Sequence, residues 1–266
     1  MMKPGHISFD RVADIYDETR AIPEPEISQV LDSIGNYLNE QEKVLDLGVG
    51  TGRFARPLQS RGYDVIGIDI SSKMLQTGVP KGLQQPILAD ACALPFKEKA
   101  FHSTLSIHLM HLLTDWVDAL EEAIRVTREN LMTVGRFWLN EDTPIKYYEN
   151  LLIESGDYHG SPGLGEKELP QYVEPYSRSL VAIRKDVVEA DEAIRRIQDR
   201  VYSFQWRIPD QAHEKAAEQA RIKYSGKQLE VEEEIYLYVW RIEDLEKSIK
   251  GLREIEAPPQ LLPRQF

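Results

Sequence analysis

The feature that most constrains the fold is a glycine-rich turn that follows a short apolar strand. Residues 43–52 are Lys-Val-Leu-Asp-Leu-Gly-Val-Gly-Thr-Gly. Glycines at alternate positions leave no Cβ atoms where the chain enters the next helix, so backbone amides can approach a bound nucleotide-type ligand closely. A dinucleotide fingerprint, G-x-G-x-x-G, needs its third glycine at position 53, which is Arg53. The turn therefore predicts a nucleotide-type pocket with a different glycine spacing.

A second apolar strand ends in an acidic residue. Residues 63–68 are Tyr-Asp-Val-Ile-Gly-Ile, and Asp69 follows them. An acid about 20 positions beyond a glycine turn is placed at the carboxyl end of the neighbouring strand, where it can accept both hydroxyls of a ribose. Asp69 is therefore a candidate ribose ligand.

Strands alternate with helical stretches from about residue 43 to residue 139. This alternation predicts an α/β fold with a doubly wound, mostly parallel sheet and helices on both faces. Two later strands are expected at 180–184 and 234–242, with a helix over about 187–200 between them. The last strand is rich in β-branched and aromatic residues.

The order of these motifs resembles the class I S-adenosylmethionine-dependent methyltransferases. The resemblance is carried by D-x-G-x-G-x-G from Asp46 to Gly52, by Asp69 and Asp90 after the second and third strands, and by residues 108–116 after the fourth. It implies a Rossmann-like sheet of seven strands with the last one antiparallel. It also implies an enzyme that transfers a methyl group from S-adenosylmethionine to an O, N, C or S atom, leaving S-adenosylhomocysteine.

The resemblance gives individual residues a role. Asp46 would hold the methionine amino group, Asp69 the ribose and Asp90 the adenine edge, while Tyr16 and Arg20 would close over the cofactor. The cofactor-binding residues that it implies are Tyr16, Arg20, Asp46, Gly48, Val49, Gly50, Thr51, Gly52, Asp69, Ile70, Met74, Asp90, Ala91, Cys92, Ser106, Ile107 and His108.

Catalytic and acceptor-binding residues are less constrained. His108 and His111 open a leucine-rich segment, where histidines serve either proton transfer or packing and capping. A general base is needed only when the acceptor is protonated at neutral pH. Aromatic candidates for the acceptor pocket, which at such spacings are also typical of a core, are Trp138, Tyr147, Tyr148, Tyr202 and Trp206.

We expect a single methyltransferase domain over residues 1–242, followed by a C-terminal helix and tail over 243–266. Within the domain, 1–42 form an N-terminal arm and helix, 43–140 the cofactor-binding half, and 141–242 the acceptor side. Residues 155–175 are rich in glycine and proline. A loop of this length is typical of a lid or a binding loop, and a surface excursion is the alternative.

The amino-acid composition limits the classes of molecule that the protein is expected to bind. The net charge of -12, from 44 acidic and 32 basic residues, works against a non-specific hold on a phosphate backbone. A small-molecule acceptor is therefore expected, with no nucleic acid. The single cysteine and the lack of clustered acids predict no metal site.

No apolar stretch approaches the ~18 residues of a membrane span, and the first residues lack the apolar core of a signal peptide. A cytoplasmic location without a membrane partner is expected, and the oligomeric state is left open. Three alternatives to a small-molecule methyltransferase stay open. They are an RNA methyltransferase, a nicotinamide-dependent Rossmann-fold oxidoreductase and a non-catalytic protein that binds the cofactor.

Overall fold

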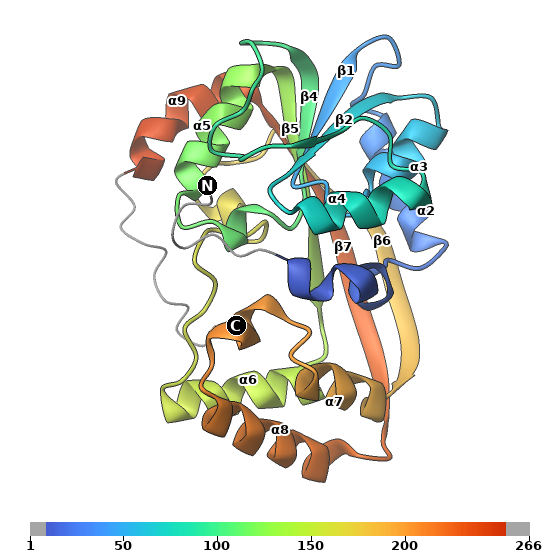
Figure 1. Ribbon diagram of the computed structural model, residues 1–266, viewed down its shortest axis with the longest axis vertical. Helices are drawn as coiled ribbons and strands as arrows, with labels where there is room; N and C mark the ends of the chain where they lie inside the picture. The colour runs from blue at the N-terminus through green and yellow to red at the C-terminus, as the bar shows by residue number, and fades with distance from the viewer. Residues whose placement is uncertain (1–8, 254–266) are drawn as a thin grey trace. The chain divides into compact units, whose positions relative to one another are not determined.

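The computed structural model describes residues 9–253, which are organised around one mixed sheet (Figure 1). Its strands are β1 (Lys43–Leu47), β2 (Asp64–Asp69), β3 (Pro86–Leu88), β4 (Phe101–Ser106), β5 (Thr127–Trp138), β6 (Ser177–Glu189) and β7 (Gln228–Arg241). The spatial order is β3-β2-β1-β4-β5-β7-β6, and β7 is antiparallel. The predicted doubly wound sheet of seven strands is therefore confirmed.

Helices connect and cover these strands. They are α1 (Tyr16–Arg20), α2 (Glu26–Gly35), α3 (Ala55–Ser60), α4 (Ser72–Gly78), α5 (Trp116–Val126), α6 (Pro144–Ser155), α7 (Ala190–Gln198), α8 (Asp210–Tyr224) and α9 (Ile242–Arg253). Short 3-10 turns are η1 (Asp10–Ile15), η2 (Val79–Lys81), η3 (Met110–Leu112), η4 (Leu169–Gln171) and η5 (Ser203–Arg207). No helix within residues 9–253 is long and apolar enough to cross a membrane.

Parallel pairing brings the carboxyl ends of the central strands to one edge. β1 pairs in parallel with β2 and with β4, so Val44 lies opposite Val65 on one side and Ser103 on the other. The apolar run of β1 is buried throughout, as expected of a parallel strand covered on both faces. The glycine turn, Asp69 and His108 therefore emerge at the same edge of the sheet.

Helices cover both faces of this part of the sheet (Figure 1). On one face, Ile34 of α2 and Leu58 of α3 join Val44 and Leu105 in the main core cluster. On the other face, the buried stripe of α5 includes Leu120. Helix α9 packs along α5. The apolar faces of these helices pack against the sheet. This packing holds in place the edge of the sheet where β1, β2 and β4 end.

The described residues divide into two compact units. The first holds residues 9–135, 162–182 and 235–253, and the second holds 136–161 and 183–234. The second unit has its own core, in which Tyr148 and Leu152 of α6 pack against Ala216 and Ala220 of α8. The single domain over residues 1–242 stays a prediction. The expected tail beyond α9, residues 254–266, lies outside the described residues.

The two last strands are longer than the sequence pattern predicts. β6 covers Ser177–Glu189 where a strand over 180–184 was expected, and β7 starts at Gln228, before the predicted 234. Residues 187–189, assigned to a helix from their sequence, belong to β6, and α7 starts at Ala190. The adjacent valines at 187 and 188 explain the difference, because β-branched residues favour a pleated strand.

Candidate cofactor and active site

A pocket of about 60 Å³ lies at the carboxyl edge of the sheet, within the first unit. The ends of β1, β2 and β4, the chain after β3 and the N-terminal arm contribute to its wall. Its lining residues are Phe9, Tyr16, Gly48, Gly50, Ile68, Asp69, Ile70, Met74, Ala89, Asp90, Ala91, His108, Leu109, Leu112 and Leu113. The first motif, the acids after β2 and β3, and the segment after β4 therefore meet at one place.

The glycine turn forms one wall from bare backbone. Gly48 and Gly50 have φ of 76° and 56°, in the left-handed region that favours glycine. A Cβ atom on Gly50 would lie 3.0 Å from Cε of Met74, and one on Gly48 would lie 2.9 Å from Cδ1 of Leu109. The N–H of Gly48 also donates to the carbonyl oxygen of Ile68 at 2.9 Å. Side chains at these two positions would fill the pocket and strain the turn.

Asp69 ends β2 with its carboxylate at the pocket wall. Its Oδ2 accepts the N–H of Gly50 at 2.9 Å, and its Oδ1 accepts the N–H of Ser71 at 2.7 Å. Burial raises the pKa of Asp69, although these backbone donors act in the opposite direction. Each carboxylate oxygen can accept a further hydrogen bond. Asp69 is thus oriented by the turn and keeps acceptor sites for two hydroxyl groups.

Asp46 lies beneath the turn and does not line the pocket. Its side chain is 4% exposed. Burial raises the pKa of Asp46 to about 7, with Arg53 opposing the shift and Asp69 adding to it. A cation bound nearby would favour the ionised form. A ligand's ammonium group nearby could therefore favour ionisation of Asp46, although this carboxyl group is buried from solvent.

Acidic side chains that sequence reasoning missed tie the N-terminal arm, residues 9–20, to residues that neighbour the pocket in sequence but do not line it. Asp10 accepts a hydrogen bond from the Ser71 hydroxyl, and Asp14 pairs with Lys73 at 2.9 Å. Asp17 accepts from Thr51 and pairs with Lys81 at 2.8 Å and Arg56 at 3.2 Å. The spacing of these aspartates, at i, i+4 and i+7, was the available signal, because it places them on one helical face.

The arm also carries aromatic side chains into the pocket. The rings of Phe9 and Tyr16 meet edge to face at 5.7 Å, and both line the pocket. Arg20, the second predicted arm residue, does not line the pocket, and its carbonyl oxygen accepts from Arg53 at 2.5 Å. Burial opposes ionisation of Asp17, but Lys81, Thr51 and Arg56 outweigh it and lower its pKa. The arm is thus held over the pocket by charged contacts.

Several residues implied by the resemblance do not line the pocket. They are Arg20, Asp46, Val49, Thr51, Gly52, Cys92, Ser106 and Ile107. Val49 packs against Gly67, where an added Cβ would come within 2.6 Å of its side chain. Sγ of Cys92 lies 3.5 Å from the carbonyl oxygen of Asp115. Ile107 belongs to the main core cluster.

His108, His111 and Glu166 form a cluster beside the pocket. His108 has a φ of 59° and lines the pocket. Its ring centroid is 6.3 Å from that of His111. Nδ1 of His111 lies 3.7 Å from Oε2 of Glu166, a residue that the sequence did not single out. Left-handed backbone at a non-glycine residue is strained and is frequent at functional sites.

None of the five aromatic candidates for the acceptor pocket lines this pocket, and all of them lie in the second unit. The Tyr148 hydroxyl is buried and hydrogen-bonded to Nδ1 of His213 at 2.7 Å. Tyr147 packs against Tyr224, and Tyr202 stacks on Phe204. Trp206 donates to the carbonyl oxygen of Arg200 at 2.7 Å, and Trp138 is 47% exposed. Arg136 lies over the Trp138 ring at 5.7 Å, so all five have partners inside that unit.

Comparison with known proteins identifies the family. Residues 45–132 match the model of the methyltransferase domain. A demethylmenaquinone methyltransferase of Renibacterium salmoninarum is 33% identical over 45% of this chain and 52% of the relative. A tRNA (carboxymethyluridine(34)-5-O)-methyltransferase of Arabidopsis thaliana is 29% identical over 53% of this chain and 34% of the relative. The chain thus spans about half of the first relative and a third of the second.

A solved structure of a proposed methyltransferase from Bacillus halodurans shares the fold, with a TM-score of 0.52 and 16% identity. The match covers 81% of this chain and 98% of that chain. Residues 45–132 therefore match the methyltransferase domain family, and the sheet around them has the class I methyltransferase fold.

The cofactor that this family implies is S-adenosylmethionine, and the chemistry of several residues at the pocket suits its parts, although the pocket of about 60 Å³ has to widen to hold it. The bare turn at Gly48 and Gly50 leaves space that any Cβ atom would fill. Asp69 offers free acceptor sites for a ribose, and buried Asp46 matches an ammonium group. Among residues 9–253, no group of three or more His, Cys, Asp and Glu side chains could hold a metal ion.

Proposed function

We propose that the protein is a methyltransferase that uses S-adenosylmethionine to methylate a small molecule. The observation that carries the proposal is the meeting of the glycine turn, Asp69 and Asp90 around one pocket, in a chain whose residues 45–132 match the methyltransferase domain. The demethylmenaquinone methyltransferase relative favours a small acceptor. The acidic net charge of -12 favours it over an RNA acceptor.

The cofactor supplies an electrophilic methyl group, so the protein mainly has to orient the two reactants and exclude water. In this proposal the turn at Gly48 and Gly50 admits the ligand, Asp69 accepts the ribose hydroxyls and Asp90 meets the adenine edge. The carboxylate of Asp46 balances the positive charge of the cofactor's ammonium group. Phe9 and Tyr16 of the arm cover the pocket. His108, which follows the end of β4, lines one side of it.

Two experiments test the proposal in sequence. Calorimetry of the full chain with S-adenosylhomocysteine and with NAD separates a methyltransferase from an oxidoreductase. Incubation with S-adenosylmethionine carrying a labelled methyl group then follows, using a pool of small metabolites and a pool of RNA. We expect binding of S-adenosylhomocysteine alone and label in the metabolite pool. Label in RNA would favour the nucleic-acid alternative, and binding without any transfer would favour a non-catalytic protein.

A further inference from the structure

The glycine- and proline-rich segment is packed directly against the loop that follows β4. The N–H of Gly163 donates to the carbonyl oxygen of His111 at 3.1 Å. An added Cβ on Gly163 would lie 2.1 Å from the carbonyl oxygen of Met110 and 2.2 Å from that of Leu113. Leu164 is 2% exposed. This close approach of two backbones fixes residues 163–166 beside His111, inside the first unit.

Glu166 is buried there without a full set of partners. Its side chain is 10% exposed, its Oε1 is buried with no hydrogen-bond partner, and its Oε2 faces Nδ1 of His111 at 3.7 Å. Burial would raise the pKa of Glu166, but His111 and His108 outweigh burial and lower it to about 2. A buried, incompletely bonded carboxylate costs folding free energy. The segment thus carries an ionised carboxylate that packing alone does not explain.

The imidazole of His111 lies beside this carboxylate at ion-pair distance, and its Nδ1 makes no hydrogen bond. Its Nδ1 is buried and faces Glu166, whereas the side chain as a whole is 22% exposed. The exposed part of the ring therefore lies away from Nδ1. The titratable side chains around it are Glu166 and His108, and Oε2 of Glu168 approaches Gly165 close by. A carboxylate beside one nitrogen of an imidazole stabilises the ring electrostatically when its other nitrogen takes up a proton.

We propose that Glu166 is a positioning residue that holds His111 as general base for an acceptor with a weakly acidic hydroxyl group, of the phenol or enol type. The proposal rests on the proposed methyl transfer. Carboxylate acceptors are already ionised at neutral pH and aromatic amines already have a free electron pair, so neither requires a base. A phenol or enol is mostly protonated and does require one.

The proton and electron balance of the step is complete. The hydroxyl oxygen forms a bond to the methyl carbon, and the carbon–sulfur bond breaks with its electron pair staying on sulfur. The hydroxyl proton passes to Nε2 of His111. The resulting imidazolium is stabilised by the Glu166 carboxylate at Nδ1 and later returns the proton to water. No oxidant, reductant or further reactant is required.

The test uses two phenols with the full chain and labelled S-adenosylmethionine. At the same pH, 4-nitrophenol is largely ionised and 4-methylphenol is protonated. Because only the protonated phenol needs a base, Glu166→Gln should lower kcat for 4-methylphenol about 100-fold and change kcat for 4-nitrophenol less than about threefold. Glu166→Asp should restore part of the loss, and Glu174→Gln, an exposed carboxylate of the same segment, is the matched control.

Each outcome decides between the two proposals. Calorimetry with S-adenosylhomocysteine comes first, and failure of the wild-type chain to bind would reject the proposed function itself. With binding intact in both the wild type and Glu166→Gln, equal losses for the two phenols would show that Glu166 is merely structural. No loss for either phenol, or no methylation of either by the wild type, would also overturn the assignment of Glu166 and of this acceptor class.

Discussion

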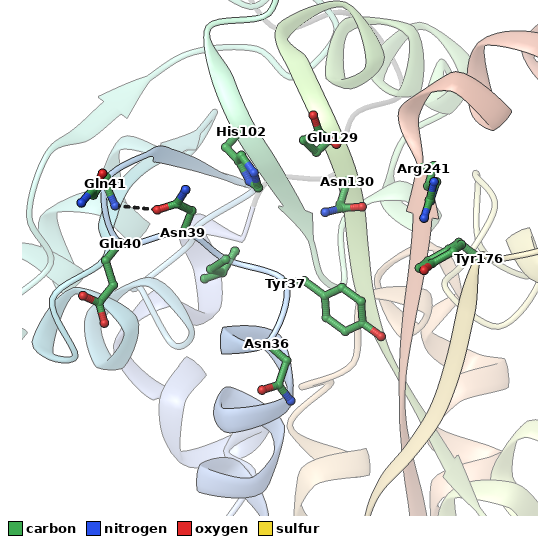
Figure 2. Close-up of a pocket in the computed structure, with 11 residues that line it drawn as sticks. Asn36, Tyr37, Asn39, Glu40, Gln41, His102, Glu129, Asn130, Tyr176 and Arg241 are labelled. Carbon is green, nitrogen blue, oxygen red and sulfur yellow. Dashed lines mark hydrogen bonds between the residues drawn. The ribbon is translucent and has the colours of Figure 1, made fainter.

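The two edges of the sheet in the first unit each carry a hollow, and the hollows differ in size and in strain. The amino-edge hollow has about 700 Å³ and a polar lining from residues 36–41, His102 and Arg241 (Figure 2). The carboxyl-edge pocket has about 60 Å³. Gly48 and Gly50 line the small pocket with left-handed backbone, whereas none of the described residues around the large hollow has a positive φ.

The difference teaches that volume is a poor guide to a site in this fold. The open hollow holds exposed polar groups at ordinary backbone geometry. The small pocket has the strained, left-handed backbone of His108 and, in or near its wall, acids whose pKa burial raises, Asp46 and Asp69. Strain and perturbed titration persist only where the surrounding structure supports them, and both are typical of functional sites.

The largest expected effect contrasts a glycine in the pocket with one in open space. Gly50→Val should reduce affinity for S-adenosylhomocysteine more than about 1000-fold, because the side chain would occupy the ligand's place. Gly62→Val is the control, since Gly62 also has a positive φ, 96°, but has no atom within 4 Å of an added Cβ. Calorimetry gives the affinities and circular dichroism the fold. A folded Gly50→Val that binds normally would contradict the assignment.

The next contrast compares the two ends of β2. Asp69→Ala should weaken binding of S-adenosylhomocysteine by about 2 to 4 kcal/mol, because two hydrogen bonds to a charged group are lost together. Asp64→Ala, at the amino end of the same strand, should leave the affinity unchanged, since Asp64 contacts Gln85 at the opposite edge. Equal affinities for the two variants, measured by calorimetry, would remove Asp69 from the site.

A smaller effect concerns stability against pH. The folded-state pKa of Asp46, about 7, exceeds its ordinary value of 3.8, so the stability that the protonated carboxyl contributes is fully present below pH 3.8 and is lost progressively as pH rises from 3.8 to 7. At pH 8, Asp46→Asn should therefore raise the free energy of unfolding, measured with urea, by about 1 to 3 kcal/mol. This gain in stability should be smaller at pH 5.

The amino-edge hollow supplies the control for that measurement. Glu129→Gln removes an exposed carboxylate that lines the large hollow and should give no pH-dependent gain. Asp46→Asn should also bind S-adenosylhomocysteine more weakly, because it cannot ionise beside the ammonium group. Identical urea midpoints for wild type and Asp46→Asn at pH 8 would mean that the carboxyl does not cost stability in its ionised form.

The smallest expected effect concerns the arm. Asp17→Ala should reduce affinity for S-adenosylhomocysteine about fivefold, because its ion pairs are only partly buried. Asp14→Ala, whose pair with Lys73 is more exposed, should change it less. Hydrogen exchange in residues 9–20 should slow when S-adenosylhomocysteine is added to the wild type. Exchange that ligand does not alter, together with full affinity in Asp17→Ala, would show that the arm does not cover the site.

The sequence predicted the fold because strand and turn patterns depend on local chemistry, and some of the site residues that it singled out, among them Gly48, Gly50 and Asp69, line the pocket. Gly48 and Gly50 are needed where the chain turns with positive φ, and Asp69 follows from the end of its own strand. Glu166 could not be found in this way. Its place beside His111 depends on the packing of Gly163 against a distant loop, and no spacing in the sequence records that contact.

The aromatic residues show the same limit of sequence-based prediction in the opposite case, because here the sequence singled out residues that do not line the pocket. Tyr148 and Tyr202 are of a residue type that is common in ligand pockets. Their partners His213 and Phe204, however, place them within the packing of the second unit. A large apolar side chain with one polar atom suits a core and a binding site equally well. Only the tertiary partners separate the two uses.

The aspartates of the arm have a kinetic consequence. A pocket of about 60 Å³ is far smaller than the roughly 300 Å³ or more of typical ligand sites, so a ligand enters or leaves only while the arm is displaced. Displacement breaks the contacts of Asp14 and Asp17 with lysine and arginine side chains. Added salt screens such contacts. Association and dissociation should therefore both accelerate with ionic strength, and turnover limited by product release should accelerate with them.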